Sequence, residues 1–130
     1  MTWYLDTSAF VKLVREEAES TSLRQWISGR DVCSSDLLRT EARRAFAGDV
    51  DFIHVILDDL LGTIPLIRLT PDVFDEAGHL RSVAALRSLD AIHIVAAGRL
   101  NADLEGIATY DHRMVAAATE LGVAVAAPTG

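Results

Sequence analysis

Short apolar segments alternate with helical patterns along the whole chain, and this alternation limits the fold more than any other feature of the sequence. The expected strands are residues 3–5, 31–33, 64–69, 107–109 and 123–125. The first expected helix begins near Ser8, and the others cover residues 19–28, 36–46, 51–61, 71–82, 89–99 and 112–121. Strands that are separated by helices pair in parallel, with helices packed on both faces of the sheet. The sequence therefore predicts a three-layer α/β/α sandwich around a central parallel sheet.

Length and composition indicate one domain. The chain has 130 residues, of which 50% are hydrophobic, so residues 1–130 can bury one real core but not two. No apolar run reaches the roughly 18 residues of a membrane span, and the first residues lack the layout of a signal peptide. Cys33 is the only cysteine, which excludes an internal disulfide and fits a reducing compartment. We therefore expect a cytoplasmic protein without membrane contact, in which Cys33 is a small buried apolar residue.

The charge of the chain argues against broad binding of nucleic acid. The net charge is −7, so most of the surface repels a polyanion. This does not exclude a nuclease, because bound divalent ions would offset an acidic pocket. Nearly all positive charge comes from arginine, which donates two parallel hydrogen bonds to phosphate, and Lys12 is the only lysine. Arginine over lysine can also be a compositional bias.

Four acidic residues occupy positions that suit a metal site. Asp6 follows the first expected strand, and Asp111 follows the strand at 107–109. Because the carboxyl ends of parallel strands meet at one edge of the sheet, where ligands bind in such folds, these two acids share an edge. Glu41 lies within the apolar half of its expected helix, and Asp90 opens an almost entirely apolar helix. Carboxylates that converge repel each other unless a hard cation neutralises them.

Each acid also has an ordinary structural explanation. Asp6, Asp90 and Asp111 stand at helix starts, where aspartate caps the backbone or stabilises the helix dipole. Glu41 could pair with a neighbouring arginine or occupy a flank position at the open edge of the sheet. His93 lies one turn after Asp90 on the same face, and we interpret it as a packed, hydrogen-bonded core residue. Taken together, four acids at element ends favour a site over coincidence.

Four stretches of the chain resemble the PIN-domain ribonucleases, and among them the VapC toxins of prokaryotic toxin–antitoxin pairs. The stretches are LDTSA at 5–9, SSDLLRTEARRA at 34–45, LRSLDAIH at 86–93 and TYDHR at 109–113. They span nearly the whole chain, and four matches in register are fairly specific. The departures are modest: Tyr110 stands where the family often has a small polar residue, and the first strand carries the bulky Trp3 and Tyr4.

The resemblance implies a PIN-like fold and an acidic pocket for Mg²⁺ or Mn²⁺. The residues that it assigns to the pocket are Asp6, Glu41, Asp90 and Asp111, with Ser8 and Thr109 as hydroxyl neighbours. It also implies endonucleolytic cleavage of RNA, a homodimer, and a cognate antitoxin that occludes the site. Transfer, ribosomal and messenger RNA all remain open as substrates.

A site of this kind would hydrolyse the phosphodiester bond with a metal-activated water. Asp6 and Asp90 are the first expected ligands and Asp111 the next, while Glu41 acts directly or through water. Glu41 or Asp111 could take the proton from the attacking water. One or two ions would serve. Arg87 and Arg113 are candidates for phosphate contact, or else form surface ion pairs.

Other folds with acids at strand ends fit less well. A receiver-type phosphate-transfer domain needs a lysine late in the chain, and a haloacid-dehalogenase-type phosphatase needs an aspartate where Ser8 stands. No glycine-rich dinucleotide or phosphate loop is present. The remaining alternative is a catalytically inactive PIN-like domain that binds RNA or a protein partner.

Overall fold

The structure is a computed structural model that describes residues 1–130. Five strands alternate with seven α-helices and one short 3-10 helix. In chain order the elements are β1 (Thr2–Leu5), α1 (Thr7–Val14), α2 (Ser20–Ile27), β2 (Asp31–Ser35), α3 (Leu37–Ala45), α4 (Asp51–Thr63), β3 (Leu66–Ile67), α5 (Pro71–His79), α6 (Ser88–Gly98), η1 (Asn101–Asp103), β4 (Leu104–Ala108), α7 (His112–Glu120) and β5 (Val125–Ala126). The predicted alternation of strands and helices is confirmed.

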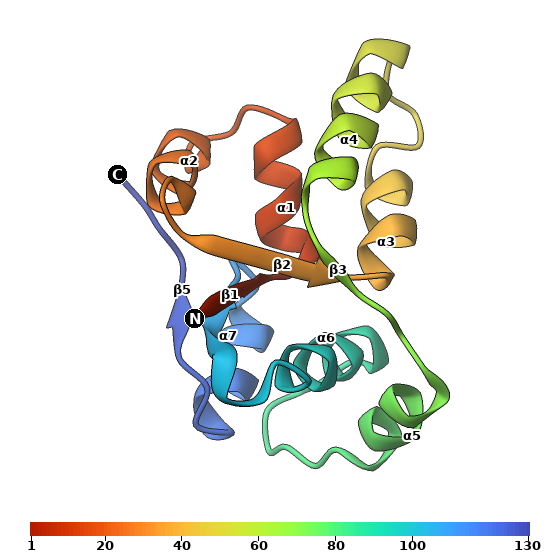
Figure 1. Cartoon of the computed structure of the whole chain (residues 1–130), viewed down its shortest axis with the longest axis vertical. Coiled ribbons are helices and arrows are strands. Elements are labelled where there is room, and N and C mark those ends of the chain that lie inside the picture. Colours follow the sequence, from red (N-terminus) through yellow and green to blue (C-terminus); the bar gives the residue numbers. More distant parts are fainter.

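The strands form one sheet in the order β3-β2-β1-β4-β5, and every neighbouring pair is parallel. Figure 1 shows α1, α2, α3 and α4 on one side of the sheet and α5, α6 and α7 on the other. This is the predicted three-layer α/β/α arrangement with a central parallel sheet. No helix of the structure combines the length and the apolar character that crossing a membrane requires.

The core lies on both faces of the sheet because successive strand residues point to opposite sides. Tyr4, Cys33 and Ile107 pack with buried side chains of α6 and α7. Leu5 and Ala108 point the other way and pack against Ala9 of α1. The burial of Cys33 confirms its interpretation as a small core residue.

Two elements, β3 and α5, are shorter than predicted by three residues or more. The expected strand at 64–69 reduces to β3, since Pro65 has no N–H to donate and contributes only its carbonyl oxygen, 3.0 Å from the Ser34 nitrogen. The helix predicted to reach Ser82 ends at His79, because the backbone of Leu80 is extended. Residues 80–87 instead form a loop between α5 and α6. Conversely, β2 runs two residues further than predicted, to Ser35.

The strand order creates a switch point that positions the site. From β1, the chain first adds β2 and β3 on one side of the sheet and then β4 and β5 on the other. In open α/β sheets, ligands bind outside the carboxyl ends of the strands where the order reverses. Here those ends belong to β1 and β4, which are followed by Asp6 and Asp111.

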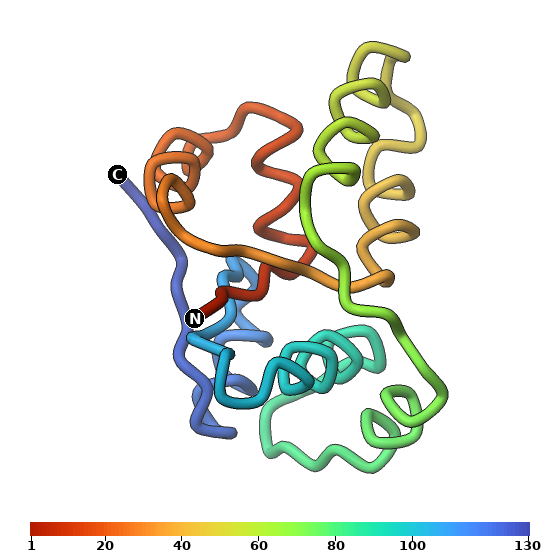
Figure 2. The backbone as a smooth tube through the Cα atoms, in the orientation of Figure 1, coloured from red at the N-terminus to blue at the C-terminus, as the bar shows by residue number.

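The C-terminal residues run back past the sheet toward α2 (Figure 2). The hydroxyl of Tyr110 donates a hydrogen bond to the carbonyl oxygen of Pro128 over 2.8 Å, which ties this tail to the turn after β4. The tail then ends beside α2.

Candidate active site

Asp6 is a buried carboxylate at the switch point, with 3% of its surface exposed. Its Oδ1 accepts hydrogen bonds from the Ser8 hydroxyl at 2.7 Å and from the Ala9 backbone at 3.1 Å, and the second of these caps α1. Its Oδ2 accepts a hydrogen bond from the Thr109 hydroxyl. No cationic side chain forms an ion pair with it. Burial therefore raises the pKa of Asp6, and the hydroxyl donors offset only part of this rise.

Two hydroxyl groups join the ends of β1 and β4 across the switch point. The Thr109 hydroxyl donates to Asp6 and accepts the backbone N–H of Asp111 at 3.1 Å. The Ser8 hydroxyl donates to Asp6 and accepts the backbone N–H of Tyr110 at 2.9 Å. Asp111 caps α7 by accepting the backbone N–H of Arg113 at 2.9 Å. The prediction that Asp6 and Asp111 share one edge is confirmed, and so is capping by both residues.

Glu41 meets His93 at the same edge, although their helices cover opposite faces of the sheet. Its Oε1 accepts hydrogen bonds from the Thr7 hydroxyl at 2.7 Å and lies 2.6 Å from His93 Nε2. The other ring nitrogen, Nδ1, lies 2.6 Å from the Tyr4 hydroxyl, which donates to Ser35 over 2.8 Å. A continuous polar chain thus runs from β2 through β1 and α6 to α3.

This hydrogen-bond network keeps the carboxyl group of Glu41 ionised. Burial raises the pKa of Glu41, but hydrogen bonds from His93 and Thr7 outweigh that effect and hold the pKa below its ordinary value. Burial also raises the pKa of Tyr4, so its phenol stays neutral. The alternative of an arginine partner for Glu41 is wrong, because the partner is His93. The interpretation of His93 as a packed, hydrogen-bonded residue is confirmed, since only 3% of it is exposed.

Asp90 stands in the first turn of α6, one turn before His93. Its Oδ2 accepts a long hydrogen bond of 3.4 Å from the backbone N–H of Arg87. Neither Arg87 nor Arg113 forms an ion pair, so the alternative that they are surface ion pairs is wrong for both.

The oxygen atoms at this edge are of the kind that binds a hard divalent cation. One carboxylate oxygen makes no hydrogen bond in each of Glu41, Asp90 and Asp111. All these donors are oxygens, which Mg²⁺ and Mn²⁺ prefer. No three acidic, histidine or cysteine side chains, however, lie close enough together to hold one ion. Mg²⁺ usually takes only one or two carboxylates and keeps several waters, so the assigned metal ligands stay a prediction.

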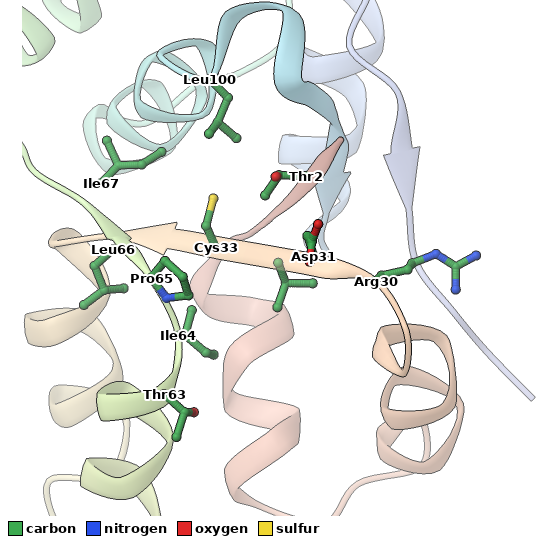
Figure 3. A pocket seen from close by; sticks show the side chains of 11 residues that line it. Thr2, Arg30, Asp31, Cys33, Thr63, Ile64, Pro65, Leu66, Ile67 and Leu100 are labelled. Carbon is green, nitrogen blue, oxygen red and sulfur yellow. The ribbon is translucent and has the colours of Figure 1, made fainter.

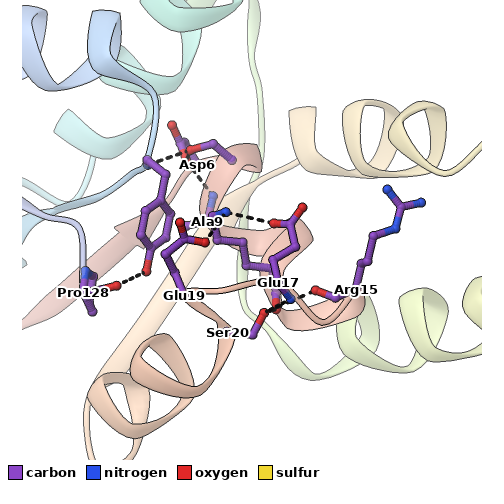
Figure 4. A network of polar contacts seen from close by, with 10 residues as sticks. Asp6, Ala9, Arg15, Glu17, Glu19, Ser20 and Pro128 are labelled. Carbon is purple, nitrogen blue, oxygen red and sulfur yellow. Dashed lines mark hydrogen bonds and ion pairs between the residues drawn. The ribbon is translucent and has the colours of Figure 1, made fainter. Parts of the chain in front are cut away.

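A second polar network flanks the site at the end of α1 (Figure 4). Lys12 donates to Glu17 and Glu19, both at 2.9 Å, and its nitrogen lies 4.9 Å from the centroid of the Tyr110 ring. The Ser20 hydroxyl donates to the carbonyl oxygen of Lys12 at 2.7 Å. The only lysine is therefore paired with two glutamates and is not free to contact an anion.

Sequence reasoning missed Tyr4 as part of the site. It lies two residues before Asp6 in a strand, and the sequence pattern marks it only as a bulky strand residue. The available signal was chemical: a buried tyrosine hydroxyl usually finds a hydrogen-bond partner. Here that partner is the ring that contacts Glu41.

Comparisons with known proteins agree with this architecture. The family model described as PIN domain matches residues 3–120. The chain is 42% identical over 127 residues to ribonuclease VapC46 of Mycobacterium tuberculosis (strain ATCC 25618 / H37Rv), covering 97% of both chains. It is 37% identical over 135 residues to ribonuclease VapC47 of Mycobacterium tuberculosis (strain CDC 1551 / Oshkosh), covering 96% of both.

A solved structure also has the same fold. Mycobacterium tuberculosis VapC20, described as a sarcin-ricin loop cleaving toxin, superposes with a TM-score of 0.76 at 16% identity. The match covers 97% of this chain and 99% of that one. Strand order, family model and near full-length similarity to VapC ribonucleases lead to one conclusion: this chain belongs to the PIN-domain family.

Proposed function

We propose that this chain is a Mg²⁺- or Mn²⁺-dependent endoribonuclease that serves as the toxin of a type II toxin–antitoxin pair. Family membership and the similarity to VapC ribonucleases support ribonuclease activity. The observation that carries the proposal is the carboxylate of Asp6, which is buried at the switch point without a cationic partner. Such a group costs free energy unless a cation reaches it. The proposal extends to a homodimer and to a cognate antitoxin that covers the site.

The carboxylates divide into two roles in this proposal. Asp6, Asp90 and Asp111 would hold the cation through oxygens at the ends of β1, α6 and β4. A divalent cation, when bound, offsets charge on the phosphate and lowers the pKa of coordinated water. Glu41 or Asp111 would accept the proton from the water that attacks phosphorus. That attack forms one P–O bond and breaks another, and the departing oxygen takes up a proton.

The geometry around Glu41 supports its place near the reacting water. The ionised carboxylate is held by Thr7 and His93 through Oε1 alone, so Oε2 is free of hydrogen bonds. A base that is fixed through one oxygen keeps its orientation, and its other oxygen stays available to accept a proton. His93 acts as a positioning residue, because it touches Glu41 and Tyr4.

A cleavage assay on a mixed RNA pool tests the proposal. Without added metal and with a chelator, we expect no cleavage, and Mg²⁺ or Mn²⁺ should restore it. Asp90→Asn should abolish metal-dependent cleavage while circular dichroism shows a folded protein. The matched control is Asp75→Asn, since Asp75 is an exposed residue of α5 without a side-chain hydrogen bond, and its rate should equal the parental one. A folded Asp90→Asn protein that cuts RNA at the parental rate would refute the assignment, and a parental protein that binds RNA without cutting it would indicate an inactive binding domain.

A further inference from the structure

We propose that a cavity between α5 and α6 binds a backbone phosphate of RNA next to the scissile one, through Arg81 and Arg87. This inference rests on the proposed function and specifies how the substrate is held. The cavity has a volume of about 400 Å³. The end of α5, the loop of residues 80–87 and the first turn of α6 form its walls.

The lining of this cavity is positive in a strongly negative protein. Its residues are Ala77, Gly78, Leu80, Arg81, Ser82, Ala84, Leu86, Arg87, Ser88 and Ala91, which include two arginines and no acid. The chain as a whole carries a net charge of −7. A concave surface of one charge sign raises the local concentration of ligands of the opposite sign. The cavity is therefore suited to an anion.

Both guanidinium groups are free to bind a ligand. Six of the 12 lysine and arginine residues form ion pairs, namely Lys12, Arg15, Arg24, Arg39, Arg43 and Arg99. Arg81 and Arg87 form no ion pair, and neither guanidinium donates a hydrogen bond to the protein. The Ser88 hydroxyl beside them is also without a partner. The cavity thus presents forked donors whose capacity is not used internally.

Two acids, Glu120 and Asp90, hold the frame of the cavity, and neither forms an ion pair with Arg81 or Arg87. Glu120, at the end of α7, accepts hydrogen bonds from the Ser82 hydroxyl at 2.6 Å and from the backbone N–H groups of Val83 at 2.9 Å and Ala84 at 3.3 Å. Asp90 accepts the backbone N–H of Arg87 at 3.4 Å. Both carboxylates are thus engaged with the backbone or with a hydroxyl, and the loop is fixed at two points.

The position of the cavity selects RNA as its ligand. It shares the start of α6 with Asp90, one of the acids assigned to the reaction, and Arg87 is three residues away from that acid. An acidic site repels a polyanion, so a substrate with consecutive phosphates needs a positive contact close by. Guanidinium forks match phosphate oxygens bidentately. A single strand could place one phosphate at the acids and a neighbouring one at the arginines.

A binding experiment in EDTA tests this site without cleavage. Fluorescence anisotropy with a labelled single-stranded oligouridylate gives Kd at several salt concentrations for the parental chain and for the double variant Arg81→Gln/Arg87→Gln. We expect Kd to rise at least about tenfold and the slope of log Kd against log salt to fall by about 0.7 or more. The control is Arg44→Gln, because Arg44 is exposed, forms no ion pair and lies in the last turn of α3.

The outcomes separate this inference from the proposed function. If the double variant keeps the parental Kd and salt slope, the phosphate site is refuted whether or not the parental chain cuts RNA. If RNA binding is unchanged but binding of a labelled polyglutamate peptide weakens, the cavity serves an acidic protein segment and the RNA assignment fails. If Arg44→Gln weakens binding as much as the double variant does, the effect is general charge and the site is refuted. Loss of affinity in the double variant alone supports it, even if no cleavage occurs with metal.

Discussion

The two ends of the parallel sheet differ in the size of their cavities and in the polarity of the side chains that lie there. The largest cavity, about 560 Å³, lies at the amino end, between the starts of β1 and β2 and the segment that enters β3 (Figure 3). Apolar side chains dominate its lining, and burial raises the pKa of its Cys33 thiol to about 11, so the thiol stays protonated at neutral pH. The carboxyl end instead brings acids and hydroxyls together. Cavity size alone would therefore point to the end opposite the proposed site.

Two aspartates at opposite ends of neighbouring strands illustrate the difference between the two ends of the sheet. Asp31 opens β2 and is exposed, whereas Asp6 follows β1 and is buried among hydroxyl donors. Residue type is the same, yet only Asp6 lies at the switch point. The position of each aspartate relative to the strand direction, more than residue type, decides whether its carboxylate is buried among hydroxyl groups or exposed.

The pair Asp6→Asn and Asp31→Asn should separate the two ends most strongly. Asp6→Asn removes the negative charge that we assign to cation binding, so metal-dependent RNA cleavage should fall by about 100-fold or more. Asp31→Asn should leave the rate within about twofold, since an exposed surface substitution has little effect. Initial rates on one RNA substrate measure both. Equal losses in the two variants would remove the distinction between the ends.

Gly106→Ala tests how tightly the sheet is packed around β4, at a distance from the acidic residues of the site. A Cβ atom at Gly106 would lie 2.4 Å from a ring carbon of Trp3 and 2.6 Å from the carbonyl oxygen of Ala124. The backbone atom cannot move cheaply, so we expect a loss of about 1–3 kcal/mol in the free energy of unfolding. Denaturant titration measures it. Gly62→Ala is the control, because a Cβ there meets nothing within 4 Å and α4 should gain up to about 1 kcal/mol.

The layered fold and part of the site follow from the sequence by general rules. Alternating patterns predict the parallel sheet, and the direction of its strands brings Asp6 and Asp111 to one edge. The apolar neighbours of Glu41 predict that it is half-buried, as observed. These inferences work because each depends on local periodicity or on one topological rule.

The remaining features depend on contacts between distant residues. His93 contacts Glu41 from a helix on the other side of the sheet, and helical periodicity gives no information on that pairing. The early end of α5 likewise depends on a loop that Glu120 holds from α7. Pro65 was a visible signal against a long third strand, because proline cannot donate to a sheet.

The dependence of stability on pH should show the cost of burying Asp6. Its folded-state pKa lies above the unfolded value of about 3.9. The folded chain therefore binds more protons between these two values, and this contribution to stability is lost as pH rises through them. In metal-free buffer at pH 7, Asp6→Asn should raise the free energy of unfolding by about 1 kcal/mol. Denaturant titrations from pH 4 to pH 7 measure this difference. If the free energy of unfolding of the parental chain rose relative to that of the variant as pH rises, the proposed cost of burying the Asp6 carboxylate would be contradicted.

Cys33→Ala should have the smallest effect. The side chain lines the amino-end cavity, and its sulfur lies on the side of β2 that faces Leu100 and Ile67 (Figure 3). Loss of one buried sulfur atom should lower the free energy of unfolding by less than about 1 kcal/mol and leave the RNA cleavage rate unchanged. Alkylation of the native parental thiol should be slow, and fast alkylation would show that this end is open and reactive.

The location of a bound Mn²⁺ ion tests the central claim most directly. A crystal grown with Mn²⁺ gives an anomalous difference map in which the ion is identified independently of the protein atoms. We predict a peak coordinated by Asp6, with Asp90 or Asp111 or waters completing the shell. A peak only at the amino end of the sheet, or no peak in a protein that still cleaves RNA with Mn²⁺, would contradict a metal site at the carboxyl ends of β1 and β4.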